Sequence, residues 1–232
     1  MIRIHDRDIR GKTRTGWLDS KHTFSFGNFM DPKRMGFRSL RVINDDVVIP
    51  GAGFDTHPHS DMEIITYILE GELAHKDSLG TGSTIRPGEI QRMSAGTGIE
   101  HSEFNPSNDN GVHLLQIWLR PETRGLAPSY EQKAFDRTAA KGKFHLIGSR
   151  EGGSDVITIH QDVKLYVALL SEGDETTYTL DEGRGGFLQV ARGHITLNGE
   201  VLKEGDGAEI SGEDTLTVKA DTDAEVLLFD LA

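Results

Sequence analysis

The 232-residue sequence contains no cysteine. Disulfide bonds and thiolate metal ligands are therefore excluded, and histidine, aspartate and glutamate remain as side chains that could hold a transition metal. No apolar stretch is long enough to cross a bilayer as a helix, and the first residues, Met1–Asp8, lack the apolar core of a signal peptide. We therefore expect a soluble protein that stays in the cytoplasm and has no membrane partner.

Positive charge is also scarce. The chain has 25 Lys and Arg against 37 Asp and Glu, a formal net charge of −12, and no run of basic residues. Binding to nucleic acid depends on Lys and Arg neutralising phosphates, so a direct nucleic-acid partner is not expected. With 36% hydrophobic and 27% charged residues the composition is that of a globular protein, long enough for one large β domain or two smaller ones.

Helical periodicity is weak, and the best candidate for a helix is a short piece at Pro128–Phe135. Short runs rich in β-branched residues recur instead between Gly, Pro, Asn and Asp, a pattern typical of an all-β sandwich or barrel. These runs are Leu40–Ile43, Ile64–Leu69, Val112–Leu119, Leu165–Leu170, Phe187–Val190, Thr215–Val218 and Glu225–Leu231. The Gly- and Arg-rich stretch Pro121–Gly153 is interpreted as a connector between two halves.

The two halves resemble repeats of one unit. Glu70-Gly71-Glu72 parallels Arg192-Gly193-His194, and Pro87-Gly88-Glu89 parallels Glu204-Gly205-Asp206. We therefore predict two stacked β-barrels, one in residues 1–135 and one in residues 136–232. Counting from these glycines without gaps sets His57, His59, His101 and Glu103 against Thr179, Asp181, Val218 and Ala220, which predicts that only the first barrel keeps metal ligands.

His57-Pro58-His59 and His101-Ser102-Glu103 are the most informative motifs. Their i, i+2 spacing places both members of each pair on one face of a strand, so two adjacent strands would direct four ligands toward one point. Three imidazoles and one carboxylate suit Fe(II), Mn(II), Ni(II), Cu(II) or Zn(II), whereas magnesium and calcium prefer oxygen ligands alone. The sequence predicts a mononuclear metal site.

Other residues near these motifs leave alternatives open. Glu63 competes with Glu103 as the acidic ligand, or could hydrogen-bond a ligating imidazole, since it follows His59 by four residues. His113 could face the same cavity, with packing or support of a ligand favoured over ligation. The remaining histidines are interpreted as surface residues or hydrogen-bonded core residues: His5, His22, His75, His145, His160 and His194.

The motifs also resemble a known family. Gly51-x5-His57-x-His59-x3-Glu63 and Pro87-Gly88 followed by His101-x3-Asn105 resemble the two cupin motifs. Three longer segments are similar to the pirin family of bicupins: His22-Thr-Phe-Ser-Phe-Gly27, Glu63-Ile-Ile-Thr-Tyr-Ile-Leu-Glu-Gly71 and Met93-Ser-Ala-Gly-Thr-Gly-Ile-Glu-His-Ser-Glu103. This resemblance implies an all-β bicupin whose metal ligands are His57, His59, His101 and Glu103, with a metal-free second cupin. It implies Fe(II), with Mn, Ni, Cu, Co or Zn as alternatives.

Bacterial pirins resemble quercetin 2,3-dioxygenases, so the resemblance implies an oxidoreductase whose partners are a small aromatic substrate and dioxygen. Glu103 would serve both as ligand and as the catalytic base that takes the flavonol hydroxyl proton, after which ring cleavage would release carbon monoxide. An apolar mouth for such a substrate could come from Phe24, Phe26, Phe29, Phe54 and Trp118, although core packing is the favoured role for each. The alternative is a non-enzymatic metal-binding regulator that docks to a transcription-related protein. A monomer is expected.

Overall fold

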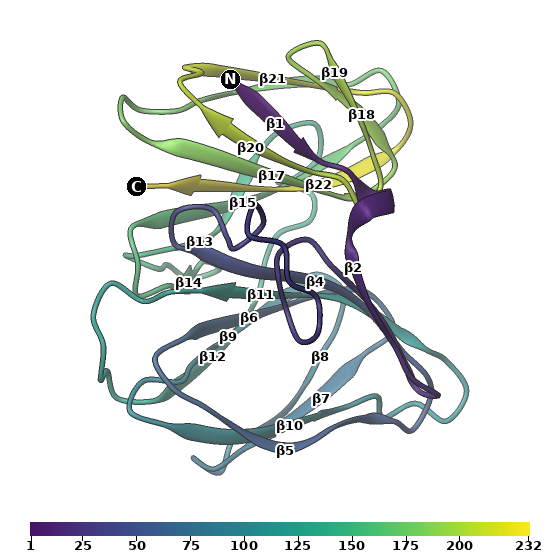
Figure 1. Cartoon of the computed structure of the whole chain (residues 1–232), viewed down its shortest axis with the longest axis vertical. Helices are drawn as coiled ribbons and strands as arrows, with labels where there is room; N and C mark the ends of the chain where they lie inside the picture. The colour runs from purple at the N-terminus through teal and green to yellow at the C-terminus, as the bar shows by residue number, and fades with distance from the viewer. The chain divides into compact units, whose positions relative to one another are not determined.

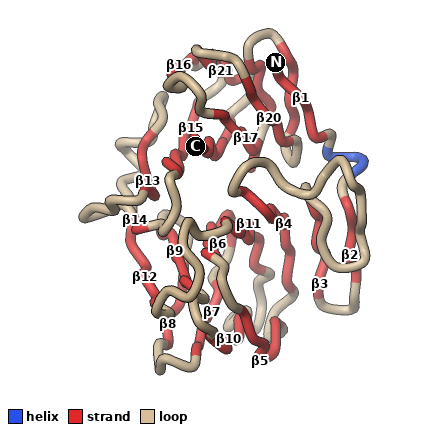
Figure 2. Tube along the Cα trace, turned by 60° about the vertical axis from the view of Figure 1, so that its left-hand side comes forward, coloured by secondary structure: helices blue, strands red, loops and turns tan.

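The structure is a computed structural model that describes residues 1–232, and it consists almost entirely of β-strands. Its only helix is one turn of 3₁₀-helix, Arg7–Ile9, blue in Figure 2. No helix is long and apolar enough to cross a membrane. The chain folds into two compact units, which we call the N-terminal unit (residues 11–135 and 151–161) and the C-terminal unit (residues 1–10, 136–150 and 162–232).

The N-terminal unit contains one larger and one smaller antiparallel sheet (Figure 1). The strands of these sheets are β2 (Gly11–Arg14), β3 (Leu18–His22), β4 (Leu40–Val48), β5 (Gly53–His59), β6 (Glu63–Glu70), β7 (Leu73–Asp77), β8 (Gly82–Ile85), β9 (Glu89–Ser94), β10 (Ile99–Phe104), β11 (Val112–Leu119) and β12 (Ser129–Ala134). The short strand β14 (Ile157–Thr158) lies in this unit but in neither of the two sheets. The larger sheet has the order β12-β9-β6-β11-β4-β3-β2, and the smaller has the order β5-β10-β7-β8.

An aliphatic cluster packs the two sheets of this unit together. Val48, Ile68 and Leu114 come from the larger sheet, and Leu73 and Ile85 come from the smaller one. Strand β6 is buried along seven of its eight residues, as expected for the nearly continuous apolar run of a central strand. The cluster stabilises the frame from which the site residues project, because burial of aliphatic side chains is the main favourable term in folding.

The C-terminal unit repeats this arrangement. Its strands are β1 (Ile2–His5), β13 (His145–Ser149), β15 (Val163–Leu170), β16 (Glu175–Thr179), β17 (Gly185–Arg192), β18 (His194–Leu197), β19 (Glu200–Lys203), β20 (Gly207–Ser211), β21 (Thr215–Ala220) and β22 (Ala224–Leu231). The order β20-β17-β22-β15 matches β9-β6-β11-β4, and β16-β21-β18-β19 matches β5-β10-β7-β8. The predicted internal repeat is confirmed by this topology.

The paired glycines that revealed the repeat occupy equivalent turns. Gly71 and Gly193 have φ of 74° and 76°, and an added Cβ would lie 2.5 Å and 2.1 Å from a backbone carbonyl oxygen. Gly88 and Gly205 both have φ of 90°. Positive φ with no room for a side chain is tolerated well only by glycine, which explains why these residues stand out in the sequence.

The ungapped count between the repeats was wrong in register. It set Thr179 and Val218 against the paired residues His57 and His101, but β16 and β21 pair Thr176 with Val218 and Thr179 with Thr215. The inference that the ligands are lost does not depend on this shift. The buried positions of these two strands are Thr176, Leu216, Val218 and Ala220, none of which is a ligand for the metals considered.

Two local predictions were also wrong. The segment proposed as a helix, Pro128–Phe135, contains strand β12, and the proposed connector 121–153 contains both β12 and β13. Pairing with β9 over Ser129–Ala134 satisfies the backbone of β12. This tertiary pairing decides the conformation where the local pattern is weak.

The sequence suggested a division into residues 1–135 and 136–232. In the structure, each compact unit instead combines separate segments of the chain. Strand β1 pairs with β20 in register from Ile2 opposite Ile210 to His5 opposite Gly207, so the first ten residues belong to the C-terminal unit. Residues 151–161 belong to the N-terminal unit, where the Thr158 carbonyl accepts a 2.9 Å hydrogen bond from Arg92 Nε. Contacts between residues far apart in sequence decide both assignments.

Asn105, part of the second cupin-like motif, has a structural role. Its side-chain Nδ2 donates to the carbonyl oxygens of Val48 (3.2 Å), Ile49 (3.2 Å) and Asn110 (2.9 Å), and its Oδ1 accepts from Ser107 N at 3.0 Å. The residue is buried. One side chain therefore satisfies backbone groups at the end of β4 and in the loop that precedes β11.

We predict that Asn105→Ala lowers the free energy of unfolding by about 2–4 kcal/mol, because each buried polar group left without a partner costs about 1–3 kcal/mol. Denaturant unfolding measures the change. The control is Asn108→Ala in the same loop, at an exposed position, which should change stability by less than about 0.5 kcal/mol. Equal effects of the two substitutions would contradict this role of Asn105.

Candidate metal centre

The two histidine motifs lie on adjacent antiparallel strands, as their spacing predicted. His57 and His59 are on β5, and His101 is on β10, where it lies directly opposite His57. Ligand-capable atoms of these three imidazoles all lie within 4.8 Å of one another. Two strands are therefore enough to bring the three imidazoles together. His57 and His101 form a cross-strand pair, and His59 follows His57 at i+2 on the same face of β5.

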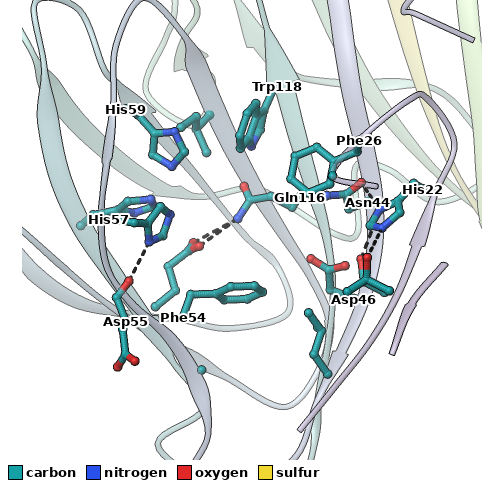
Figure 3. Close-up of a pocket in the computed structure, with 18 of the residues that line it drawn as sticks. His22, Phe26, Asn44, Asp46, Phe54, Asp55, His57, His59, Gln116 and Trp118 are labelled. Atoms are coloured by element: carbon teal, nitrogen blue, oxygen red, sulfur yellow. Dashed lines mark hydrogen bonds between the residues drawn. The ribbon is translucent and has the colours of Figure 1, made fainter. Parts of the chain in front are cut away.

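A local irregularity in β5 sets the orientation of His57. The register shifts between His101 and Glu103, which face His57 and Phe54 respectively, so β5 carries an extra residue there. Within this bulge, His57 Nδ1 donates a 2.7 Å hydrogen bond to the Asp55 carbonyl (Figure 3). The hydrogen bond fixes the tautomer, since the proton on Nδ1 leaves Nε2 with a free lone pair.

The other two imidazoles are held in their neutral form. Burial, reinforced by the neighbouring His57, lowers the pKa of His59 to about 4. Burial and the surrounding histidines lower the pKa of His101 to about 3. Both nitrogens of His101 are buried without a hydrogen-bond partner. A buried, neutral imidazole whose nitrogens have no hydrogen-bond partner is suited to a cation, so His101 fits a transition metal.

Glu103 lies behind His101 on β10 and is buried. Gln116 Nε2 on β11 donates to both of its carboxylate oxygens, at 3.2 and 3.1 Å, and Thr66 Oγ1 on β6 donates at 3.4 Å. Burial raises the pKa of Glu103, although these hydrogen bonds and the nearby histidines act to lower it. Its carboxylate falls in a second group with His101 and His75, whose ligand-capable atoms also lie within 4.8 Å of one another.

His75 was interpreted from the sequence as a surface or hydrogen-bonded core residue, and it is indeed buried and bonded. Its Nε2 lies 3.1 Å from Asp77 Oδ2, and both side chains are fully buried. It also lies beside the site, since β7 places it directly opposite Glu103. The i, i+2 spacing of His75 and Asp77 was the available signal, because it repeats the pattern of the two ligand motifs.

Glu63, the alternative acidic ligand, points elsewhere. Its Oε2 accepts hydrogen bonds from the backbone N and Nδ1 of His160, both at 3.1 Å, and lies 4.0 Å from Arg92 Nε. The suggested hydrogen bond from Glu63 to a ligating imidazole is therefore wrong. His160 lies in the segment 151–161, so this contact depends on a tertiary placement that the sequence does not reveal.

His113 does not face the cavity. Its Nε2 lies 2.7 Å from Asp45 Oδ1, and it is only half-buried. Strand alternation explains this, because Gln116 and Trp118 on the same strand line the cavity and His113 has the opposite parity. The packing role preferred for His113 agrees with its position.

The imidazoles open into a cavity of about 560 Å³ (Figure 3). Of the five aromatic residues considered for its mouth, Phe26, Phe54 and Trp118 line it, whereas Phe24 and Phe29 do not. Phe26 contacts Trp118 edge to face at 5.4 Å between ring centroids, and Trp118 contacts His59 in the same way at 5.0 Å. The cavity therefore has aromatic walls directly beside the imidazoles.

A second polar cluster lines the cavity and was not predicted. It consists of Thr13, Ser20, His22, Asn44 and Asp46, all from strands β2, β3 and β4. In Figure 3, Gln116 lies between three members of this cluster, His22, Asn44 and Asp46, on one side and His57 and His59 on the other. The signal was present in β4, where Asn44 and Asp46 occupy, at a spacing of two, the same inward face as the buried apolar residues Val42 and Val48.

Comparison with known proteins places the chain in a family. Residues 4–119 match the family model Pirin, and residues 146–231 match the model described as Quercetinase C-terminal cupin domain. The second match supports the cupin nature of the C-terminal repeat.

Full-length relatives agree with these matches. The chain is 48% identical to Quercetin 2,3-dioxygenase of Escherichia coli strain K12, with 100% of this chain and 99% of that protein covered. It is 42% identical to a Pirin-like protein of Caulobacter vibrioides over 97% of each. A crystal structure of the E. coli bacterial pirin YhhW in complex with nickel(II) is 47% identical and superimposes with a TM-score of 0.94 over 100% and 99% of the two chains. The chain therefore belongs to the pirin family and has its bicupin fold.

Proposed function

We propose that this protein is a metal-dependent dioxygenase that cleaves a flavonol such as quercetin. The observation that carries the proposal is the convergence of three imidazoles in a cavity with aromatic walls. Similarity along the whole chain to a protein named quercetin 2,3-dioxygenase supports the choice of reaction. The runner-up function, a regulator without enzymatic activity, has no such support from the site.

We propose His57, His59, His101 and Glu103 as the ligands of one divalent transition metal. The imidazoles suit Fe(II), the metal implied by the resemblance, and equally Ni(II), the ion in the E. coli pirin complex. Mn, Cu, Co and Zn are compatible with the same donors. A bound ion would supply Lewis acidity and open positions at which substrate oxygens and dioxygen can meet.

The cavity fits a planar aromatic substrate. Its volume of about 560 Å³ lies within the range of about 300–1,000 Å³ usual for small-molecule sites. Phe26, Phe54 and Trp118 can contact the faces and edges of aromatic rings.

Glu103 is the group proposed to take the proton from the flavonol hydroxyl. Its raised pKa makes it a better proton acceptor than an exposed carboxylate. Gln116 holds both oxygens in place, so the carboxylate keeps its orientation when its protonation changes. Removal of the proton leaves an electron-rich flavonol anion able to react with dioxygen.

The overall reaction balances without a further reductant. Both atoms of dioxygen enter the products, the central heterocycle opens, and one ring carbon leaves as carbon monoxide while the remainder becomes a depside ester. Aromatic walls and a proton acceptor beside the ion are therefore the contributions required of the protein.

We predict about one transition-metal ion per chain, because only the N-terminal unit carries ligand-capable groups of three or more residues. His57→Ala and His101→Ala should each empty the site while the protein stays folded, since its stability comes mainly from the aliphatic cores. Metal analysis after anaerobic purification, with circular dichroism as the folding control, measures both effects. Two ions per chain, or full occupancy in both variants, would contradict the assignment.

A second prediction separates the two carboxylates. Glu103→Gln should weaken metal binding at least about tenfold or abolish turnover, because it removes the anionic ligand and proton acceptor. The matched control is Glu63→Gln, which should retain the ion because Glu63 bonds His160 rather than an imidazole of the site. Metal titration of both variants tests this, and the reverse ranking would transfer the role to Glu63.

The reaction itself provides the third prediction. The metal-loaded protein should consume dioxygen with quercetin and release an equal amount of carbon monoxide, and both should stop after chelation or in His101→Ala. Loss of quercetin absorbance alone is not sufficient, because flavonols oxidise spontaneously. If a metal-loaded preparation releases no enzyme-dependent carbon monoxide from any flavonol, the non-enzymatic alternative is favoured.

A further inference from the structure

Asp46 is a buried acid in the wall of the cavity that the proposed chemistry does not use. It lies on β4, is 3% exposed and lines the cavity on the opposite side of Gln116 from His57 and His59 (Figure 3). Ser20 hydrogen-bonds its carboxyl group. Its second oxygen, Oδ1, is buried and has no hydrogen-bond partner.

The polar residues around Asp46 are occupied with one another. His22 Nδ1 lies 2.8 Å from Asn44 Oδ1, so Nδ1 donates and Nε2 accepts from the Thr13 hydroxyl at 2.9 Å. His22 therefore has no nitrogen left for Asp46. Among the residues that line the cavity, buried atoms without partners remain on His101, Trp118 and Asp46.

An unpartnered carboxyl oxygen in such a place has a cost. Burying a polar atom without a hydrogen bond disfavours folding, so a residue of this kind needs another reason to be there. Metal binding supplies that reason for His101, but Asp46 lies in neither group of ligand-capable residues. A hydrogen-bonding group on a bound ligand would supply it for Asp46.

We infer that Asp46 is a specificity-determining residue that recognises a hydroxyl group on an outer ring of the aromatic substrate, away from the oxygens that bind the metal. This inference rests on the proposed function and deepens it. The site would then have two polar ends, the metal centre and Asp46, joined by the aromatic wall of Phe26 and Trp118. A compound without an outer-ring hydroxyl could bind the metal centre but would leave Asp46 without a hydrogen-bond partner.

A hydroxyl is the group that fits Asp46 best. Burial, with the negative charges of Asp45 and Glu103, raises the pKa of Asp46 to about 7 against the opposing hydrogen bond from Ser20. Near neutral pH the carboxyl group is thus available in both forms. A phenolic hydroxyl can donate to the ionised form and accept from the protonated form, whereas a carbonyl or a carboxylate pairs with the protonated form alone.

The test measures binding without turnover. Quercetin, with hydroxyls on both outer rings, is compared with 3-hydroxyflavone, which keeps the 3-hydroxyl and 4-carbonyl but has no outer-ring hydroxyl. Both are titrated into metal-loaded protein without oxygen, and quenching of Trp17 and Trp118, which line the cavity, reports binding. Wild type should bind quercetin at least about tenfold more tightly, as expected for one satisfied buried hydrogen bond.

Two variants of similar size to Asp46 make the comparison specific. Asp46→Leu should reduce the preference for quercetin about tenfold or more, with less than about a threefold change for 3-hydroxyflavone. Asp46→Asn should retain most of the preference, since an amide still pairs with a hydroxyl. The control is Asp45→Asn, the neighbouring acid on the opposite face of β4, where it pairs with His113. Metal content and the melting temperature confirm that all variants are folded and loaded.

The outcomes separate this inference from the proposed function. The inference is wrong if Asp46→Leu keeps the preference for quercetin, or if it weakens the binding of both compounds equally. Asp46 would then not recognise the outer-ring hydroxyl, and the proposed function would still stand. If wild type binds neither compound, the flavonol function itself fails and removes the basis of the inference. Loss of preference in Asp46→Leu but not in Asp45→Asn supports it.

Discussion

The antiparallel pairing of β5 with β10 is the contact on which the site depends. It places His57 opposite His101, and the alternation of side chains along β5 brings His59 to the same face. The bulge in β5 then gives His57 a backbone acceptor at Asp55, which orients its ring. A slip of one residue in this pairing would turn the imidazoles toward the opposite face of the sheet, so the pairing and the site are specified together.

Packing and hydrogen bonds from both sheets surround this pair. The aliphatic cluster between the two sheets of the N-terminal unit contains none of the four proposed ligands, and it meets the cavity at Leu18, which belongs to the cluster and also lines the cavity. Gln116 and Thr66, from β11 and β6 of the larger sheet, hold Glu103 on the smaller one. Hydrogen bonds between the sheets thus orient the Glu103 carboxylate, while aliphatic packing sets the distance between the two sheets.

The C-terminal unit shows what the same topology becomes without the polar residues. Leu216, Val218 and Ala220 of β21 join a continuous aliphatic core that includes Leu188 and Leu228. Buried aliphatic side chains at these positions pack without unsatisfied polar atoms. The repeat can therefore be a packed unit or a unit with a cavity, and the choice depends on a few inward positions.

The sequence by itself determined the β class, the internal repeat and the spacing of the two histidine motifs. These are local properties: the i, i+2 spacing of His57 and His59, and the glycines at 71 and 193 whose turns need positive φ. It also carried the family resemblance that the comparisons confirm.

Only the tertiary structure decided which other residues meet the site. Sheet pairing places His75 opposite Glu103 and puts Asp46 in the wall of the cavity, whereas Glu63 bonds His160. The same dependence on long-range pairing made β12 a strand and assigned β1 to the C-terminal unit. A local pattern gives the face of a strand on which a residue lies, but hydrogen bonding between remote strands determines what that face meets.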